Sequence, residues 1–184
     1  MANEIKLALE ELREYVNMLL NDGDFTKAYI DREKAVGIEK IKAAYREGLN
    51  VRRQMINDFM EKLIKKHAPG EVTDSQLMRF TNKIKAMNDE EIRDYFLKNP
   101  DAMHEDTFNA LAAELRSRGL DREYEIVKAK KDAYTKPWTT TKEYETFNKV
   151  LTELDTYEAA LNENRLYLES ENGGLEAVDL DSFN

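Results

Sequence analysis

The chain has 184 residues, a length that suits one domain or a small core with an extended arm. It contains no Cys, which excludes disulfides, thiol catalysis and Cys-based zinc sites, and its net charge of −9 disfavours non-specific binding to nucleic acid or to an anionic membrane except through a local basic face. A charged content of 35%, with only 7 Gly and 3 Pro, is typical of a helical protein with much surface.

The N-terminal segment, residues 1–67, is expected to hold a first helix followed by a long basic helix. Asn3 caps the first helix and residues 21–23 end it. Asp24 caps the second, which continues to about Lys66 before Pro69. Its apolar residues form one stripe: Ile38, Ile41, Tyr45, Leu49, Ile56, Phe59 and Leu63. Two glycines beside this stripe, Gly37 and Gly48, either kink the helix or let another helix approach closely.

Residues 68–139 are expected to form a bundle of short helices with short connections. The expected helices cover residues 75–87, a stretch that opens at residues 88–91 and stops at Asn99 and Pro100, residues 106–118, and a stretch from Asp121 to about Tyr134. Asn88 and Glu91 have the spacing of a capping box, and Gly119 fits a left-handed helix C-cap with Leu120 as its hydrophobic contact.

The C-terminal segment is expected to hold one long acidic helix, residues 140–171, and a flexible acidic tail, residues 172–184. The helix keeps a heptad-like step of apolar residues: Phe147, Leu151, Leu154, Leu161 and Leu168. The predicted fold class is therefore all-α, a small helical bundle with an extended pair of long, coiled-coil-like helices, in one structural domain overall.

The charge is unevenly distributed along these elements. Residues 24–67 carry 11 Lys/Arg and 7 Asp/Glu, a net of +4, whereas residues 142–184 have a net charge of −8. Arg52 and Glu158 each sit inside the apolar stripe of a long helix, where a charge is costly unless it is paired. We expect the two long helices to pack antiparallel with Arg52 and Glu158 as a register pair; in the alternative, Arg52 lies at an exposed part of the stripe.

A basic helix face is the alternative binding surface for nucleic acid. Lys42, Arg46 and Arg53 fall on one side of the long helix and could follow a phosphate backbone. Glu39 and Glu47 are interleaved with them, however, which is also typical of a solvated, ion-paired face.

A protein partner is expected at the C-terminal third. Trp138 follows Pro137 near Tyr134, and an exposed Trp on a rigid loop is a natural interface anchor, although it could also cover the end of the bundle core. Glu158, Glu163 and Glu169 belong to the acidic helix, which could imitate a phosphate backbone or could simply be solvated.

No motif for catalysis or for cofactor binding is present, so we expect no enzyme, no cofactor and no metal site. Asp22, Asp24 and Glu33 have the spacing of calcium-loop ligands, but Lys27 stands where that loop needs Gly. His104 lies among acids without a second ligand pair at helical spacing, which favours a capping role.

The combination of a short, acidic, Cys-free, helical chain without motifs resembles many phage-encoded accessory proteins. This resemblance implies an inhibitor that binds a nucleic-acid-handling protein, as anti-CRISPR proteins do. Two alternatives stay open: a coiled-coil scaffold or assembly factor that self-associates as a homodimer through the long helices, and a nucleic-acid-binding protein. No signal peptide precedes the first helix and no apolar run approaches the ~20 residues that span a bilayer, so we expect a cytoplasmic protein without membrane insertion.

Overall fold

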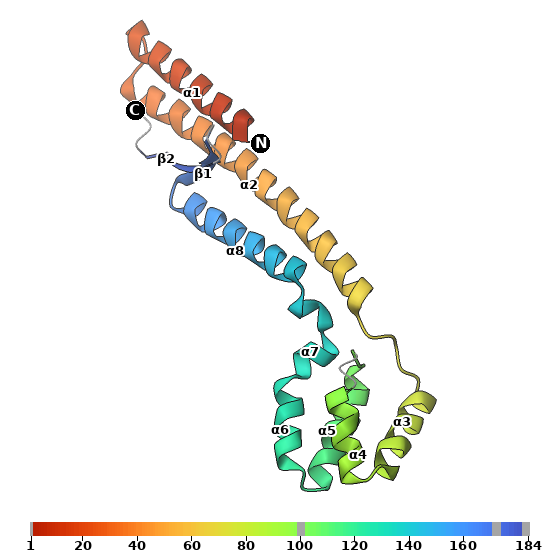
Figure 1. Cartoon of the computed structure of the whole chain (residues 1–184). Coiled ribbons are helices and arrows are strands. Elements are labelled where there is room, and N and C mark those ends of the chain that lie inside the picture. Colours follow the sequence, from red (N-terminus) through yellow and green to blue (C-terminus); the bar gives the residue numbers. More distant parts are fainter. Residues whose placement is uncertain (1, 99–101, 171–173, 182–184) are drawn as a thin grey trace. The chain divides into compact units, whose positions relative to one another are not determined.

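The computed structural model describes residues 2–98, 102–170 and 174–181 and confirms a mainly all-α fold with one long helix (Figure 1). In these residues the helices are α1 (Ala2–Asp22), α2 (Lys27–His67), α3 (Asp74–Ala86), α4 (Asp89–Lys98), α5 (Glu105–Ser117), α6 (Asp121–Ala129), α7 (Lys131–Thr135), the 3-10 helix η1 (Pro137–Thr140) and α8 (Lys142–Asn162). Two antiparallel strands follow, β1 (Arg165–Glu169) and β2 (Leu175–Asp179).

The contacts divide the chain into two compact units, which differs from the single domain and the four segments expected. Unit 1 combines Met1–Asn57 with Lys149–Asn184, and unit 2 is Asp58–Asn148. Counting charges in the sequence, unit 1 has a net charge of −7 and unit 2 of −2. The acidic character therefore belongs mainly to unit 1.

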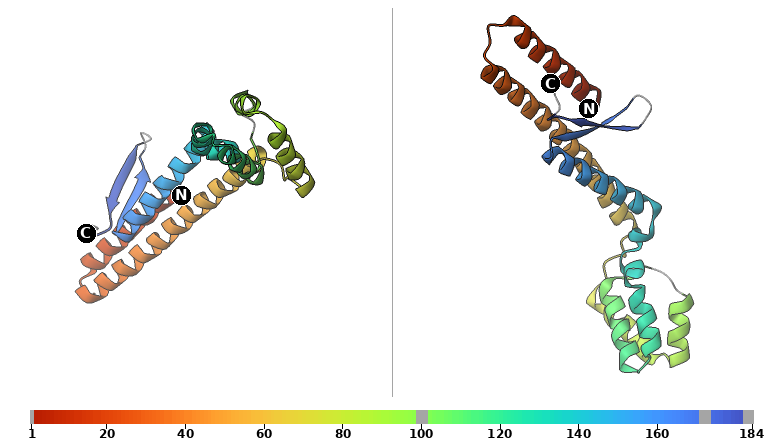
Figure 2. Two further views of the ribbon diagram at one scale, coloured as in Figure 1. Left: turned by 90° about the horizontal axis from the view of Figure 1, so that it is seen from below. Right: turned by 90° about the vertical axis from the view of Figure 1, so that its left-hand side faces the viewer.

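In unit 1, α1 and the first half of α2 lie side by side and antiparallel, as two views agree (Figures 1 and 2). The buried face of α1 consists of residues three or four apart, Ile5, Leu9, Leu12, Val16 and Leu19. Gly37 of α2 is where the helices approach closely, because a Cβ there would lie 2.9 Å from Leu12 Cδ2. The glycine thus has the second of its two expected roles.

The β-hairpin is the largest departure from the expected fold. The last helix ends at Asn162 rather than near residue 171, and residues 165–169 and 175–179 pair as strands where a helix end and a tail were expected. Leu166 and Leu168 point into the core while Arg165 and Glu169 stay exposed, which is the alternation of a half-buried strand. Leu180 is 1% exposed, so this part of the expected tail belongs to the core. Residues 171–173 and 182–184 lie outside the described residues.

Unit 2 has its own core around α5. Phe108, Leu111 and Leu115 lie on one side of that helix and pack with apolar residues of the other short helices: Ile84, Ile92, Leu120, Val127 and Tyr134. Asn88 N–H donates to Glu91 Oε2 at 2.8 Å and Glu91 N–H to Asn88 Oδ1 at 2.9 Å, which confirms the capping box. Gly119 has φ +70° and Leu120 is 7% exposed, as the C-cap prediction required.

Candidate functional site

The ion pair between α2 and α8 lies one residue away from the predicted register pair. Arg53 donates from one guanidinium nitrogen to Asp155 Oδ1 at 2.7 Å and from the other to Glu158 Oε2 at 2.9 Å. The hydrogen bond to Asp155, more than any other contact, raises the pKa of Arg53. Arg52 is exposed, so the predicted partner of Glu158 was wrong.

The reason is the ridge on which α2 meets α8. The buried residues Ile41, Tyr45 and Leu49 follow one another at intervals of four, and the next member of that series is Arg53. A step of three from Leu49 leads instead to Arg52, the residue predicted from the apolar stripe. The prediction of a charged pair joining the two long helices holds only after this shift.

Exchanging Arg53 for methionine is expected to lower the free energy of unfolding by about 0.5–1 kcal/mol, because its partners are largely solvated and the attraction is screened. The side chains of Asp155 and Glu158 are 66% and 43% exposed. Urea unfolding measures the change. Arg52→Met is the matched control and should change the free energy of unfolding by less than about 0.5 kcal/mol. An equal or larger loss in Arg52→Met would restore the original register pair.

The predicted basic face is not a set of three free cations. Lys42 Nζ donates to Glu39 Oε1 and to Asn164 Oδ1, both at 3.0 Å, and its side chain is only 14% exposed. Arg53 forms ion pairs with Asp155 and Glu158 of α8, and Arg46 is exposed. Two of the three predicted phosphate contacts are therefore occupied by acceptors of the chain itself.

The predicted partner residues separate into the two units. In unit 2, Tyr134 is 6% exposed and packs on Phe108, which places it in the core rather than on a partner surface, contrary to the prediction. Trp138 lies on η1 and is half-buried. In unit 1, Glu163 and Glu169 are exposed on the hairpin, and Glu158 pairs with Arg53.

The hairpin is held by hydrogen bonds that the sequence did not predict. Tyr45 O–H donates to the carbonyl of Tyr167 at 2.8 Å, and burial raises the pKa of that hydroxyl, so it stays a donor. Asn164, with φ +59°, makes the turn from α8 into β1. Its side-chain amide donates to Asp181 Oδ1 at 2.8 Å, and its backbone carbonyl accepts from Leu180 N–H at 2.8 Å.

These anchors place an excess of carboxylates on one ordered element, here named the acidic hairpin and defined as residues 163–170 and 174–181. Its acids are Glu163, Glu169, Glu176, Asp179 and Asp181, and Arg165 is its one cation. Arg165 lies 3.9 Å from Glu163, at the limit of an ion pair. The sequence located this acid excess at the C-terminal end but did not indicate its rigid framework.

Comparison with protein-family models, curated proteins and solved structures finds no match to this chain. Within the described ranges, no three His, Asp or Glu side chains gather closely enough to hold a metal ion. Nor does any helix of those ranges have the length and apolarity needed to cross a membrane.

Proposed function

We propose that the protein is a non-catalytic, cytoplasmic interaction protein whose acidic hairpin occupies the basic groove of a nucleic-acid-handling protein, as a phage-type inhibitor would. The observation that carries this proposal is the five carboxylates and one guanidinium on the acidic hairpin. A groove that binds phosphates attracts such a surface over a distance and speeds its association.

The rigid framework of the hairpin supports the same proposal. Leu166 and Leu168 are 0% and 2% exposed, so the strand that carries Glu169 is fixed to the core of unit 1. Glu176 lies opposite Leu168 in the strand register and is exposed. Carboxylates held by a packed element lose little conformational entropy on binding. Carboxylates on a flexible tail would lose more, because the tail must become ordered.

The two alternatives have less support. In unit 1, the apolar stripe expected for self-association is largely filled by the chain itself, since Ile41, Tyr45 and Leu49 are buried in the core. Direct binding of nucleic acid would need Lys42 and Arg53 to give up their carboxylate and amide partners. An acidic surface facing a basic protein needs neither change.

A hairpin of reduced negative charge tests the proposal. The variant Glu163→Gln, Glu169→Gln, Glu176→Gln is expected to lose capture of a nucleic-acid-binding protein from a bacterial lysate, because it removes three of the five carboxylates. The variant should also inhibit the purified partner less. The wild-type chain is expected to displace labelled nucleic acid from the partner, and the same displacement should need at least about tenfold more of the variant.

The matched control makes the same change in net charge in unit 2. Glu61, Glu71 and Glu145 are exposed there, and their replacement by Gln should leave capture and displacement unchanged. Equal loss in both variants would reduce the effect to net charge and contradict a hairpin site. Full activity of the hairpin variant would exclude the proposal outright.

A further inference from the structure

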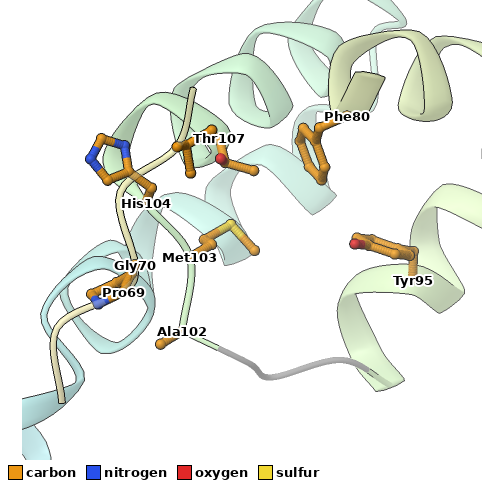
Figure 3. A pocket seen from close by; sticks show the side chains of 9 residues that line it. Pro69, Gly70, Phe80, Tyr95, Ala102, Met103, His104 and Thr107 are labelled. Atoms are coloured by element: carbon orange, nitrogen blue, oxygen red, sulfur yellow. The ribbon is translucent and has the colours of Figure 1, made fainter. Parts of the chain in front are cut away.

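Unit 2 contains a cavity of about 290 Å³ that none of the predicted sites includes. It lies between the connection after α2, the helices α3 and α4, and the start of α5 (Figure 3), and it is partly open to solvent. Phe80 and Tyr95 form one wall, and Met103 extends toward them from the segment before α5. His104 and Thr107 also line the cavity, but the His104 ring points away from Phe80 and Tyr95, and its Nδ1 accepts from Asp106 N–H at 3.3 Å (Figure 3).

The wall of the cavity is aromatic. The ring centroids of Phe80 and Tyr95 are 6.4 Å apart at an interplanar angle of 55°, a tilted arrangement in which neither ring covers the face of the other. Lys83 Nζ lies 4.7 Å from the centroid of the Tyr95 ring. The thioether of Met103 adds a polarizable group, and sulfur contacts aromatic rings favourably.

The elements that build the cavity are held in place independently of any ligand. Thr73 and Gln76 form a reciprocal capping box at the start of α3, with Thr73 N–H donating to Gln76 Oε1 at 2.9 Å. Met103 N–H donates to the Tyr134 carbonyl at 3.0 Å, which ties the segment before α5 to α7. A preformed cavity is the usual form of a small-ligand site, because binding then costs little ordering.

We propose that this cavity binds one uncharged aromatic ring of the size of indole or phenol. A cavity of about 150 Å³ suffices for benzene in an apolar core, so the observed volume holds a ring with a fused or polar substituent. Aromatic walls favour a ring set at an angle to their own, and the Thr107 hydroxyl at the site can bond one polar atom. None of the lining residues that the structure describes is a Lys, Arg, Asp or Glu, which favours neither a cation nor an anion.

The test uses the whole chain with carbon-13 in its methionine methyl groups. Indole is expected to shift the Met103 methyl signal by ring current and to saturate at roughly millimolar concentration, the range for a ligand of about nine heavy atoms. Met78, which is 62% exposed on α3 and does not line the cavity, is the internal control and should not saturate. Parallel, non-saturating shifts of both signals would overturn the proposal.

A second probe distinguishes the two sources of such a ring. N-acetyltryptophanamide represents a tryptophan side chain within a partner protein, and free indole represents a small molecule. Saturation by both indicates that a protein side chain fits; saturation by indole alone indicates a small ligand. In either case the cavity binds an aromatic ring, whereas a failure of both probes contradicts it.

A variant links the binding to the aromatic wall. Phe80→Leu removes the ring and keeps an apolar side chain, so the dissociation constant for indole should rise at least about fivefold. The control is Phe25→Leu, which changes a 38% exposed ring in unit 1 and should leave the dissociation constant unchanged. Unchanged binding by Phe80→Leu, with the helix content of the wild type by circular dichroism, would rule out this cavity. The acidic hairpin lies in the other unit, so these outcomes are independent of the proposed inhibition.

Discussion

Replacing Leu180 by alanine is expected to lower the free energy of unfolding by about 2–5 kcal/mol, the usual cost of a truncated buried leucine. Leu180 is 1% exposed, and its N–H donates to the Asn164 carbonyl at 2.8 Å. The smaller side chain would leave a void among the apolar residues of α1, α2 and the hairpin. Urea unfolding followed by circular dichroism measures this loss.

Leu175 provides the matched control on the same hairpin. Its side chain is 60% exposed on β2, so Leu175→Ala should change the free energy of unfolding by no more than about 0.5 kcal/mol. A loss below about 1 kcal/mol in Leu180→Ala would mean that residues 174–181 are the solvated tail that composition alone indicates.

Arg118→Lys is expected to lower the melting temperature of unit 2 by about 5–10 °C, although it keeps the positive charge. The guanidinium donates to three backbone carbonyls, Met87 at 2.6 Å, Lys85 at 3.0 Å and Ile84 at 3.1 Å, and to Glu114 Oε1 at 2.7 Å. These contacts fasten the C-terminal end of α3 to α5. A lysine ammonium is a compact charge and cannot reach the carboxylate and the carbonyls together.

Arg116→Lys is the corresponding control. Arg116 lies in the last turn of α5, two residues before Arg118, and has its guanidinium carbon 5.8 Å from the centroid of the Tyr124 ring, a contact that a lysine can also make. Differential scanning calorimetry of both variants should therefore show a lowered transition only for Arg118→Lys. If the two variants have the same melting temperature, the guanidinium of Arg118 does not hold α3 against α5.

Local patterns in the sequence predicted the helices well, because caps and turns act over a few residues. The capping box at Asn88 and the left-handed Gly119 were both found this way. The hairpin was missed because its leucines satisfy two periods at once. Leu161 and Leu168 are seven apart, as on a helix, whereas Leu166 and Leu168 alternate as on a strand.

What decided between these periods is distant in sequence. Strand β1 needs β2 as its partner and Tyr45 as a donor to Tyr167, and a single-sequence pattern contains neither contact. The shift from Arg52 to Arg53 has a similar origin, since the packing of α8 selects the ridge of α2 that is buried. The cavity of unit 2 joins residues of four segments, for which no local spacing exists.

The division of the chain has a consequence for the order in which it folds during synthesis. Unit 2 is one continuous stretch, so its helices leave the ribosome one after another and can pack together as soon as the last of them has been synthesised. Unit 1 joins both chain ends, and the bond from Tyr45 to Tyr167 spans 122 residues. Tyr45 and the apolar residues beside it on α2 therefore lack their hairpin contacts during the interval in which unit 2 is synthesised. A short insertion in unit 2 lengthens that interval without touching a single contact of unit 1.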